Sequence, residues 1–96
     1  MIKNTPDSSQ LRAAAERLEK YAESLTAAAQ GIWADSDLLF GGFGMGEAAA
    51  RMEKMMKQTA DELNEKSRML IEMKESLENT LHLLDEAEEA DAAARL

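Results

Sequence analysis

The sequence predicts an all-α protein, folded as an antiparallel hairpin of two long helices. Three observations lead to this prediction. Apolar residues recur in steps of three and four over most of the chain. Four of the five glycines fall within residues 41–46, and the single proline stands near the N-terminus. Because one break separates two periodic segments, one turn is implied.

The first helix is expected over residues 7–36. Asp7 and Gln10 have the spacing of a capping box, and proline is tolerated in the first turn of a helix. Behind this start, a heptad seam continues for three repeats. Its members are Leu11, Ala14, Leu18, Tyr21, Leu25, Ala28 and Ile32. Gly31 is a weak point in this helix, costing about 1 kcal/mol relative to alanine.

The turn is expected over residues 37–46, where glycine supplies positive φ angles and stops a helix. A hairpin tip is normally polar because it cannot be buried within its own hairpin. This tip instead carries Leu38, Leu39, Phe40 and Phe43. Exposed apolar clusters mark contact sites. These residues either cap the end of the bundle or contact a partner, and the sequence leaves both alternatives open.

The second helix is expected over residues 47–90, followed by a frayed acidic tail that opposes the helix dipole. Apolar residues recur here every seven positions, at Ala49, Met56, Leu63, Leu70, Leu77 and Leu84. The other core position of this repeat holds Met52, Thr59, Lys66, Met73, Thr80 and Ala87. Met55 and Met69 lie off the seam and widen the apolar face, and methionine is adaptable at binding surfaces.

A hairpin that buries one stripe per helix has a thin core. The stabilisation that such a core provides is small relative to the conformational entropy lost when the chain becomes ordered. We therefore expect association into a four-helix bundle, either as a homodimer or with another hairpin. The seven-residue repeat predicts left-handed packing at a shallow angle. The seam of this bundle is expected to consist of Leu11, Leu18, Leu25, Ile32, Met56, Leu63, Leu70, Leu77 and Leu84.

The composition argues against several functional classes. The 96 residues include 11 Lys and Arg against 19 Asp and Glu, a net charge of −8, which disfavours nucleic acid and anionic membranes as partners. The absence of Cys and the single His exclude a disulfide framework, a thiolate zinc site and a multi-His metal site. No pattern of catalytic residues is present, so we expect no enzyme, no cofactor and no metal.

Two local patterns resemble ligand sites without meeting their requirements. The carboxylates between Asp85 and Asp91 lack the Glu-x-x-His pairs of a di-iron bundle, since position 79, three residues before His82, is Asn. The glycine run at 41–46 lacks the Lys-Ser/Thr ending of a phosphate-binding loop. We also find neither a membrane span of roughly 20 apolar residues nor the apolar core of an N-terminal signal peptide. Any export would use a route that does not read such a signal.

Several features of the chain occur together in one known family. The length is near one hundred residues, the chain is acidic and has no Cys, and the Ala-rich segment 27–33 ends in Trp33. Two further features belong to the second helix: the segment of residues 59–64 and the acidic end. In these respects the chain resembles the WXG superfamily, the small helical hairpins of type VII secretion in Gram-positive and mycobacterial bacteria. Residues 59–64 are similar to a stretch of that family's early secreted antigen members.

Two motifs depart from the family pattern. The Trp-x-Gly triplet of the family corresponds here to Trp33, Ala34 and Asp35, with glycines only from position 41. The family's C-terminal export signal is an aromatic residue, three spacers and an Asp or Glu, but no Phe, Tyr or Trp follows Phe43. The nearest match is His82 with Glu86, and the second choice is Leu81 with Asp85. Either spacing places both residues on one helix face.

The resemblance implies a protein that is cytoplasmic before export and then secreted or held at the cell surface. Its role would be that of a co-secreted substrate, or of a targeting and escort partner that pairs with the helical N-terminal domain of a larger toxin. A membrane-bound secretion ATPase would be the other partner. Two alternatives remain open: an intracellular coiled-coil adaptor, and a hairpin whose tip enters the interfacial layer of a membrane.

Overall fold

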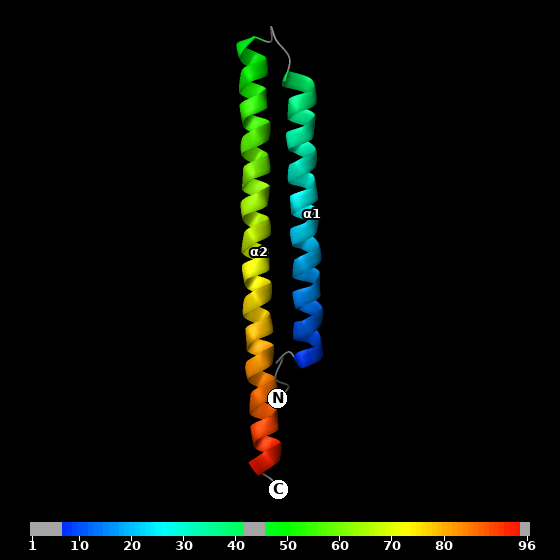
Figure 1. Ribbon diagram of the computed structural model, residues 1–96, viewed down its shortest axis with the longest axis vertical. Helices are drawn as coiled ribbons and strands as arrows, with labels where there is room; N and C mark the ends of the chain where they lie inside the picture. The colour runs from blue at the N-terminus through cyan, green and yellow to red at the C-terminus, as the bar shows by residue number, and fades with distance from the viewer. Residues whose placement is uncertain (1–6, 42–45, 95–96) are drawn as a thin grey trace, which may run out of the picture.

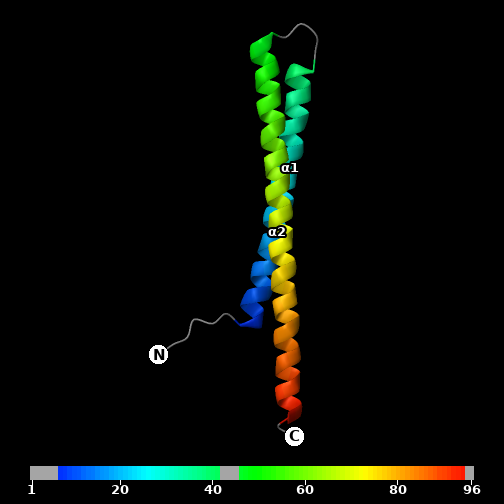
Figure 2. The ribbon, with the colours of Figure 1, turned by 90° about the vertical axis from the view of Figure 1, so that its left-hand side faces the viewer.

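The computed structural model describes residues 7–41 and 46–94, which form two helices. Helix α1 spans Ser8–Phe40 and helix α2 spans Glu47–Ala94. The helices run antiparallel, side by side, and give a rod with extents of 78 × 27 × 14 Å (Figures 1 and 2). The predicted all-α hairpin is therefore confirmed. Helix α2 continues past the beginning of α1 (Figure 1).

Helix α1 begins with the expected capping box and ends later than expected. Asp7 Oδ1 accepts from the Gln10 backbone N–H at 2.9 Å, and Gln10 Oε1 accepts from the Asp7 N–H at 3.0 Å. The predicted end at residue 36 is wrong, since the helix continues to Phe40. Gly41 then closes it with an N–H that donates to the Asp37 carbonyl at 2.9 Å. A Cβ atom at Gly41 would overlap that carbonyl oxygen, so the close approach requires glycine.

The later end of α1 changes the position of the apolar tip. Leu38, Leu39 and Phe40 belong to the last turn of α1 and not to the connecting turn in which we expected them. Phe43 and Met45 lie outside the described residues. Helix α2 also runs further than predicted, through Ala94. The acidic tail therefore belongs to α2 as far as that residue, and the alanines interspersed there favour the helical state.

The two helices contact each other through a stripe of small side chains. The buried residues of α1 recur every seven positions, at Ala15, Ala22, Ala29 and Ser36. Those of α2 lie on the same period, at Ala60, Ser67 and Leu81. The distance between packed helices depends on the side chains at the contact, so alanine and serine allow a close approach. The buried core of the single hairpin is consequently narrow.

The larger seam residues lie beside this stripe, and most of them are half-buried. Leu84 is 39% exposed. The prediction for the second core position of α2 is wrong for the single hairpin: Met52 is 46% exposed and Met73 is 52% exposed. The other members, Thr59, Lys66, Thr80 and Ala87, are exposed as well. Small residues occupy the contact instead, one position further along the chain, at Ala60 and Ser67.

Candidate interaction surface

Each helix presents two different edges beside its small stripe. Positions three residues before and four residues before a stripe member lie about 50° to either side of it. In α1 these columns are 12, 19, 26 and 33 on one side and 11, 18, 25 and 32 on the other. In α2 they are 57, 64, 71, 78 and 85 against 56, 63, 70, 77 and 84. One edge of the hairpin is therefore mostly polar and the other is apolar.

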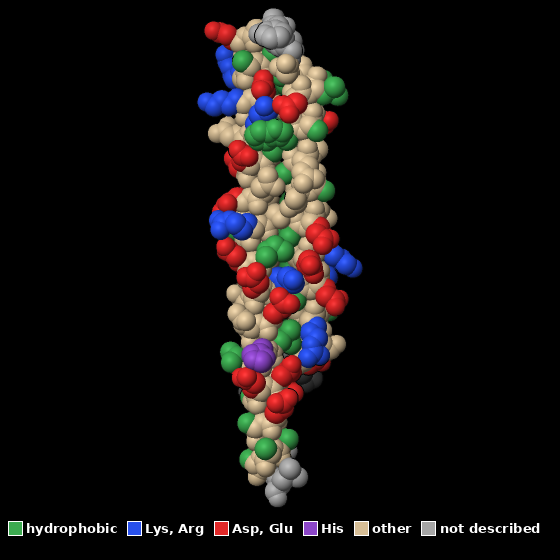
Figure 3. Space-filling view, viewed as in Figure 1, with side chains coloured by type: hydrophobic (Ala, Val, Ile, Leu, Met, Phe, Trp, Pro, Cys, Tyr) green, Lys and Arg blue, Asp and Glu red, His purple; other side chains and the backbone are tan. Residues whose placement is uncertain are grey.

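The polar edge carries three ion pairs between the helices, one toward each end of the hairpin and one between them. Arg12 Nη2 lies 3.2 Å from Asp85 Oδ2, and Lys57 Nζ lies 3.0 Å from Asp37 Oδ1. Between them, Lys74 Nζ lies 3.7 Å from Glu19 Oε2. All three pairs are partly exposed, so each contributes little to stability. Figure 3 shows a face of the rod dominated by charged side chains, with the single His in purple.

We define the apolar face by the columns on the opposite edge. It consists of Leu11, Leu18, Leu25, Ile32 and Leu39 from α1, and Met56, Leu63, Leu70, Leu77 and Leu84 from α2. Tyr21 and Met73 border it, with exposed fractions of 54% and 52%. A shallow hollow lined by Leu18, Met73 and Leu77 joins the two helices on this edge. Large side chains from both helices thus share one continuous surface that the hairpin itself leaves partly open.

Trp33, in the triplet that resembles the family motif, is 41% exposed and lies on the polar edge. It stands seven residues before the end of α1, or about 10 Å along the helix. Lys57 Nζ lies 4.9 Å from the centroid of its ring, within cation–π range. Hydrogen bonds from Lys57 to Asp37 and Glu53 raise the pKa of this ammonium above its ordinary value. Ala34 and Asp35 are exposed.

The last turn of α1 leaves its leucines exposed. Leu38 is 83% exposed and Leu39 is 58% exposed, whereas Phe40 is half-buried. Leu38 therefore does not cap the end of this hairpin. Leu38 and Leu39 therefore remain available for contact with another molecule, whereas Phe40 is partly covered.

The two export-motif candidates differ in accessibility. His82 Nε2 lies 3.1 Å from Glu86 Oε1, and the two side chains are 73% and 59% exposed. In the second pair, Leu81 is only 6% exposed, and Asp85 is held by Arg12. The i, i+4 spacing thus places one pair on the surface and places Leu81 of the other pair between the helices.

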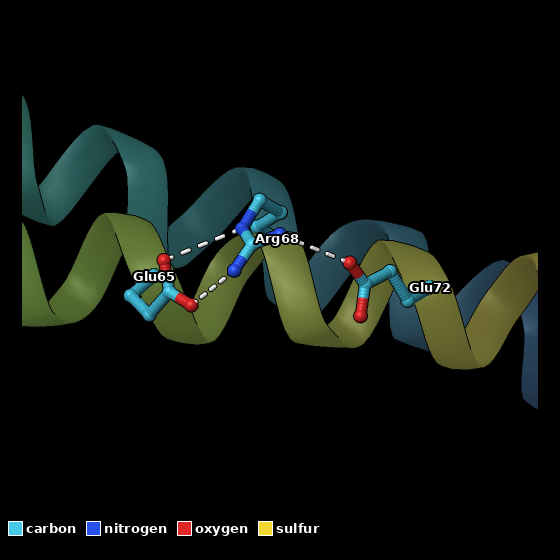
Figure 4. Close-up of polar contacts among 3 residues, drawn as sticks. All are labelled: Glu65, Arg68 and Glu72. Carbon is cyan, nitrogen blue, oxygen red and sulfur yellow. Dashed lines mark hydrogen bonds and ion pairs between the residues drawn. The ribbon is translucent and has the colours of Figure 1, made fainter.

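A further charged cluster on α2 has a local structural role. Arg68 donates to Glu72 Oε1 at 3.1 Å and to Glu65 Oε2 at 3.3 Å, with a second bond to Glu65 (Figure 4). These bonds lower the pKa of the Glu65 carboxyl and raise that of the Arg68 guanidinium. All three residues are exposed and lie on one helix, so these bonds join successive turns of α2.

Residues 7–41 and 46–94 contain neither a candidate metal cluster nor a candidate membrane span. These residues contain no group of three or more His, Asp or Glu placed to hold a metal ion. Neither helix, as described, has a stretch that is long and apolar enough to cross a membrane.

Comparisons with known proteins return no match. No protein-family model, no curated protein and no solved structure is found to be similar to the chain.

A second seven-residue column in the sequence, made of small residues, coincides with the helix contact. Ala15, Ala22 and Ala29 recur every seven residues with Ser36, and Ala60 and Ser67 have the same period. A column of small residues beside a column of leucines marks the closest helix contact. The polar edge follows from the same seven-residue spacing, as the column three residues before each member of the small stripe.

Proposed function

We propose that this protein is a bundle-forming hairpin of type VII secretion, acting as the targeting or escort partner of a larger effector or as a co-secreted substrate. The observation that carries the proposal is the apolar face, from Leu11 to Leu39 on α1 and from Met56 to Leu84 on α2. A surface of that length and composition fits another pair of helices. The secretion role comes from the resemblance of Trp33 and its surroundings to the WXG superfamily.

The exposed pair formed by His82 and Glu86 supports a role in export. A docking motif has to be reachable from outside, and both side chains are more than half exposed. The pair also lies near the end of α2 that continues past α1 (Figure 1). In the proposed function, this pair is the docking motif that the membrane-bound secretion ATPase recognises.

The apolar tip supports a second contact of the same protein. Leu38 and Leu39 are exposed at the opposite end of the rod from the export pair. Exposed apolar clusters are typical of contact sites. We assign this tip to the effector or to the export machinery. The tip adjoins the end of the apolar face at Leu39, whereas the export pair is a separate surface at the other end of the rod.

An export assay with matched variants tests this proposal. The tagged chain is expressed in a bacterium that has a type VII system, and its amount in the medium is compared with that of Glu86→Gln and His82→Ala. Both variants should keep the melting temperature, because an exposed ion pair contributes little to stability, and both should lower export. Glu89→Gln, which removes an exposed charge of the same tail, is the control and should be exported normally.

The outcomes separate the parts of the proposal. Normal export of Glu86→Gln and His82→Ala would exclude this pair as the docking motif for export. Unchanged export of the parent chain from a host that lacks the secretion ATPase would overturn the type VII role. Retention of the parent chain in cells with an active system would favour an intracellular adaptor.

A further inference from the structure

Four methionines of α2 are more exposed than methionine usually is in folded proteins. Met52, Met55, Met69 and Met73 have exposed fractions between 46% and 56%. They occupy the two outward columns of α2, at 52, 59, 66, 73 and 80 and at 55, 62, 69, 76 and 83. The column next to the contact stripe holds leucine at four of its five positions and the half-buried Met56 at the fifth. Thioether side chains therefore lie where solvent reaches them.

Two of these methionines share the hollow on the apolar edge. Met69 and Met73 lie one helical turn apart on α2 and line this hollow together with Leu18 of α1 and Leu77 of α2. The other residues of its lining are polar, namely Glu72, Ser76 and Thr80. The two thioethers thus make up half of the apolar residues of a hollow that joins the helices, and they are exposed within it.

An exposed thioether is open to oxidation by peroxides, and methionine is the only source of sulfur in a chain without Cys. The sulfur lone pair attacks one oxygen of hydrogen peroxide, and the O–O bond breaks. The hydroxide that leaves takes the remaining proton of the transferred oxygen and becomes water. The sulfur is oxidised by two electrons to a sulfoxide, and the peroxide is reduced. The reaction needs no other group of the protein, so the exposure of the sulfur-bearing side chain governs its rate.

The polar lining of the hollow offers little to a sulfoxide oxygen, which only accepts hydrogen bonds. The Glu72 carboxylate is itself an acceptor and takes a hydrogen bond from Arg68 at 3.1 Å. The Thr80 hydroxyl donates to the Ser76 carbonyl at 2.9 Å. Among the seven residues that line the hollow, the Ser76 hydroxyl is the one remaining side-chain donor. Two sulfoxide oxygens therefore depend on water, and the hollow becomes polar.

We propose that Met69 and Met73 form a modification site for peroxide-type oxidants, and that their conversion to sulfoxides weakens the packing of α2 on α1 around the hollow. The change is reversible, because methionine sulfoxide reductases return each sulfoxide epimer to the thioether. The site goes beyond the proposed function and involves no export. It also affects bundle formation, because a partner that covers the apolar face would have to bury the two polar S–O groups.

The rate of oxidation at each methionine tests whether the site is reachable. The methyl resonances of the seven methionines, assigned with single Met→Leu variants of the full chain, report each side chain separately in NMR spectra. In excess hydrogen peroxide at neutral pH, Met69 and Met73 should be oxidised at least about twofold faster than the half-buried Met56. Met52 and Met55 have similar exposed fractions and should react as fast as the pair.

Two matched double variants test whether the hollow is where oxidation acts. Full oxidation should lower the melting temperature of the parent by at least about 4 °C, and sulfoxide reductases with a dithiol should restore it. Met69→Leu with Met73→Leu keeps the hollow apolar and should reduce this fall to less than about half. Met52→Leu with Met55→Leu removes two similarly exposed thioethers outside the hollow, so its melting temperature should fall as far as that of the parent.

Three results would overturn the inference. Oxidation of Met69 and Met73 no faster than that of Met56 would mean that peroxide does not reach the pair preferentially. An unchanged melting temperature of the fully oxidised parent would show that sulfoxides do not disturb the hollow. An equal fall in both double variants would place the effect at other methionines of the chain. Each measurement uses the purified chain without a secretion system, so its failure is distinguishable from a failure of the export assay.

Discussion

The hydroxyl of Ser67 on α2 donates to the carbonyl oxygen of Ala22 on α1 at 2.8 Å. The Thr26 hydroxyl lies 2.8 Å from the same Ser67 oxygen. Because a hydroxyl carries one proton, and that of Ser67 goes to Ala22, Thr26 is the donor of the second bond. Ser67 thus joins the helices at one height and sets their register, which a repeating stripe of small residues leaves weakly defined.

Substitution of Ser67 should separate the hydrogen bonds from the space that serine leaves. Ser67→Ala should lower the free energy of unfolding by about 1 kcal/mol, because the bonds to Ala22 and Thr26 are lost. Ser67→Leu should cost about 1–3 kcal/mol through overpacking at the closest contact. Urea denaturation followed by circular dichroism measures both. Ser76→Ala, at an exposed serine, should change stability by less than about 0.5 kcal/mol. A Ser67→Leu variant as stable as the parent would contradict the contact stripe.

Ser36 should be replaceable at a gain. Its side chain is buried at 0% exposure and its Oγ has no hydrogen-bond partner. Ser36→Ala removes an unsatisfied hydroxyl and should raise the free energy of unfolding by about 1 kcal/mol. Ser24→Ala has the same change in helix propensity at an exposed position, so the difference between the two variants isolates the buried hydroxyl. A loss of stability in Ser36→Ala would reveal a partner for this oxygen.

Gly31 offers a second stabilising change. It lies within α1, and a Cβ atom at this position would meet nothing within 4 Å. Gly31→Ala should therefore add about 1 kcal/mol to the free energy of unfolding through helix propensity alone. Thermal unfolding followed by circular dichroism checks this value. A decrease in stability would show that the space around Gly31 is occupied in solution.

Truncation of leucines on the apolar face should lower the free energy of unfolding more than the changes above. Leu63→Ala and Leu70→Ala should each cost about 2–5 kcal/mol if the face is covered in the assembled protein. Leu38→Ala, at an 83% exposed leucine, is the control. Denaturation midpoints at two protein concentrations report the loss. A cost below about 0.5 kcal/mol at both leucines would remove them from the interface.

Alkaline pH should uncouple Trp33 from Lys57. Hydrogen bonds to Asp37, and then to Glu53, raise the pKa of Lys57. Their stabilising effect is fully present below the pKa of an unfolded lysine and is lost as pH rises through the higher folded value. Trp33 is the only Trp, so its fluorescence should titrate above the range of a free lysine. A Tyr21→Phe background removes tyrosine ionisation, and Lys57→Met in that background should abolish the transition. Its persistence there would exclude Lys57 as the source.

The local features of the helices could be predicted from the sequence. Asp7 and Gln10 predicted the capping box, because a cap depends on residues three positions apart. The glycines from position 41 predicted one turn. The end of α1 was missed by four residues, since Ser36–Phe40 contains no helix breaker and only the first glycine stops the helix. The i, i+4 spacing placed His82 and Glu86 on one helix face, but their exposure to solvent is seen only in the structure.

By itself, the sequence determined the two helices and a seven-residue period, because backbone hydrogen bonds and helix propensity depend on neighbours along the chain. The period alone does not identify the contact column: Leu18, Tyr21 and Ala22 each belong to a column that repeats every seven residues. Only the tertiary structure decided that the Ala22 column lies at the contact and the Leu18 column beside it. The physical reason is steric, since two long helices approach most closely where their side chains are smallest. The leucines are thereby displaced to one edge, where a partner can reach them.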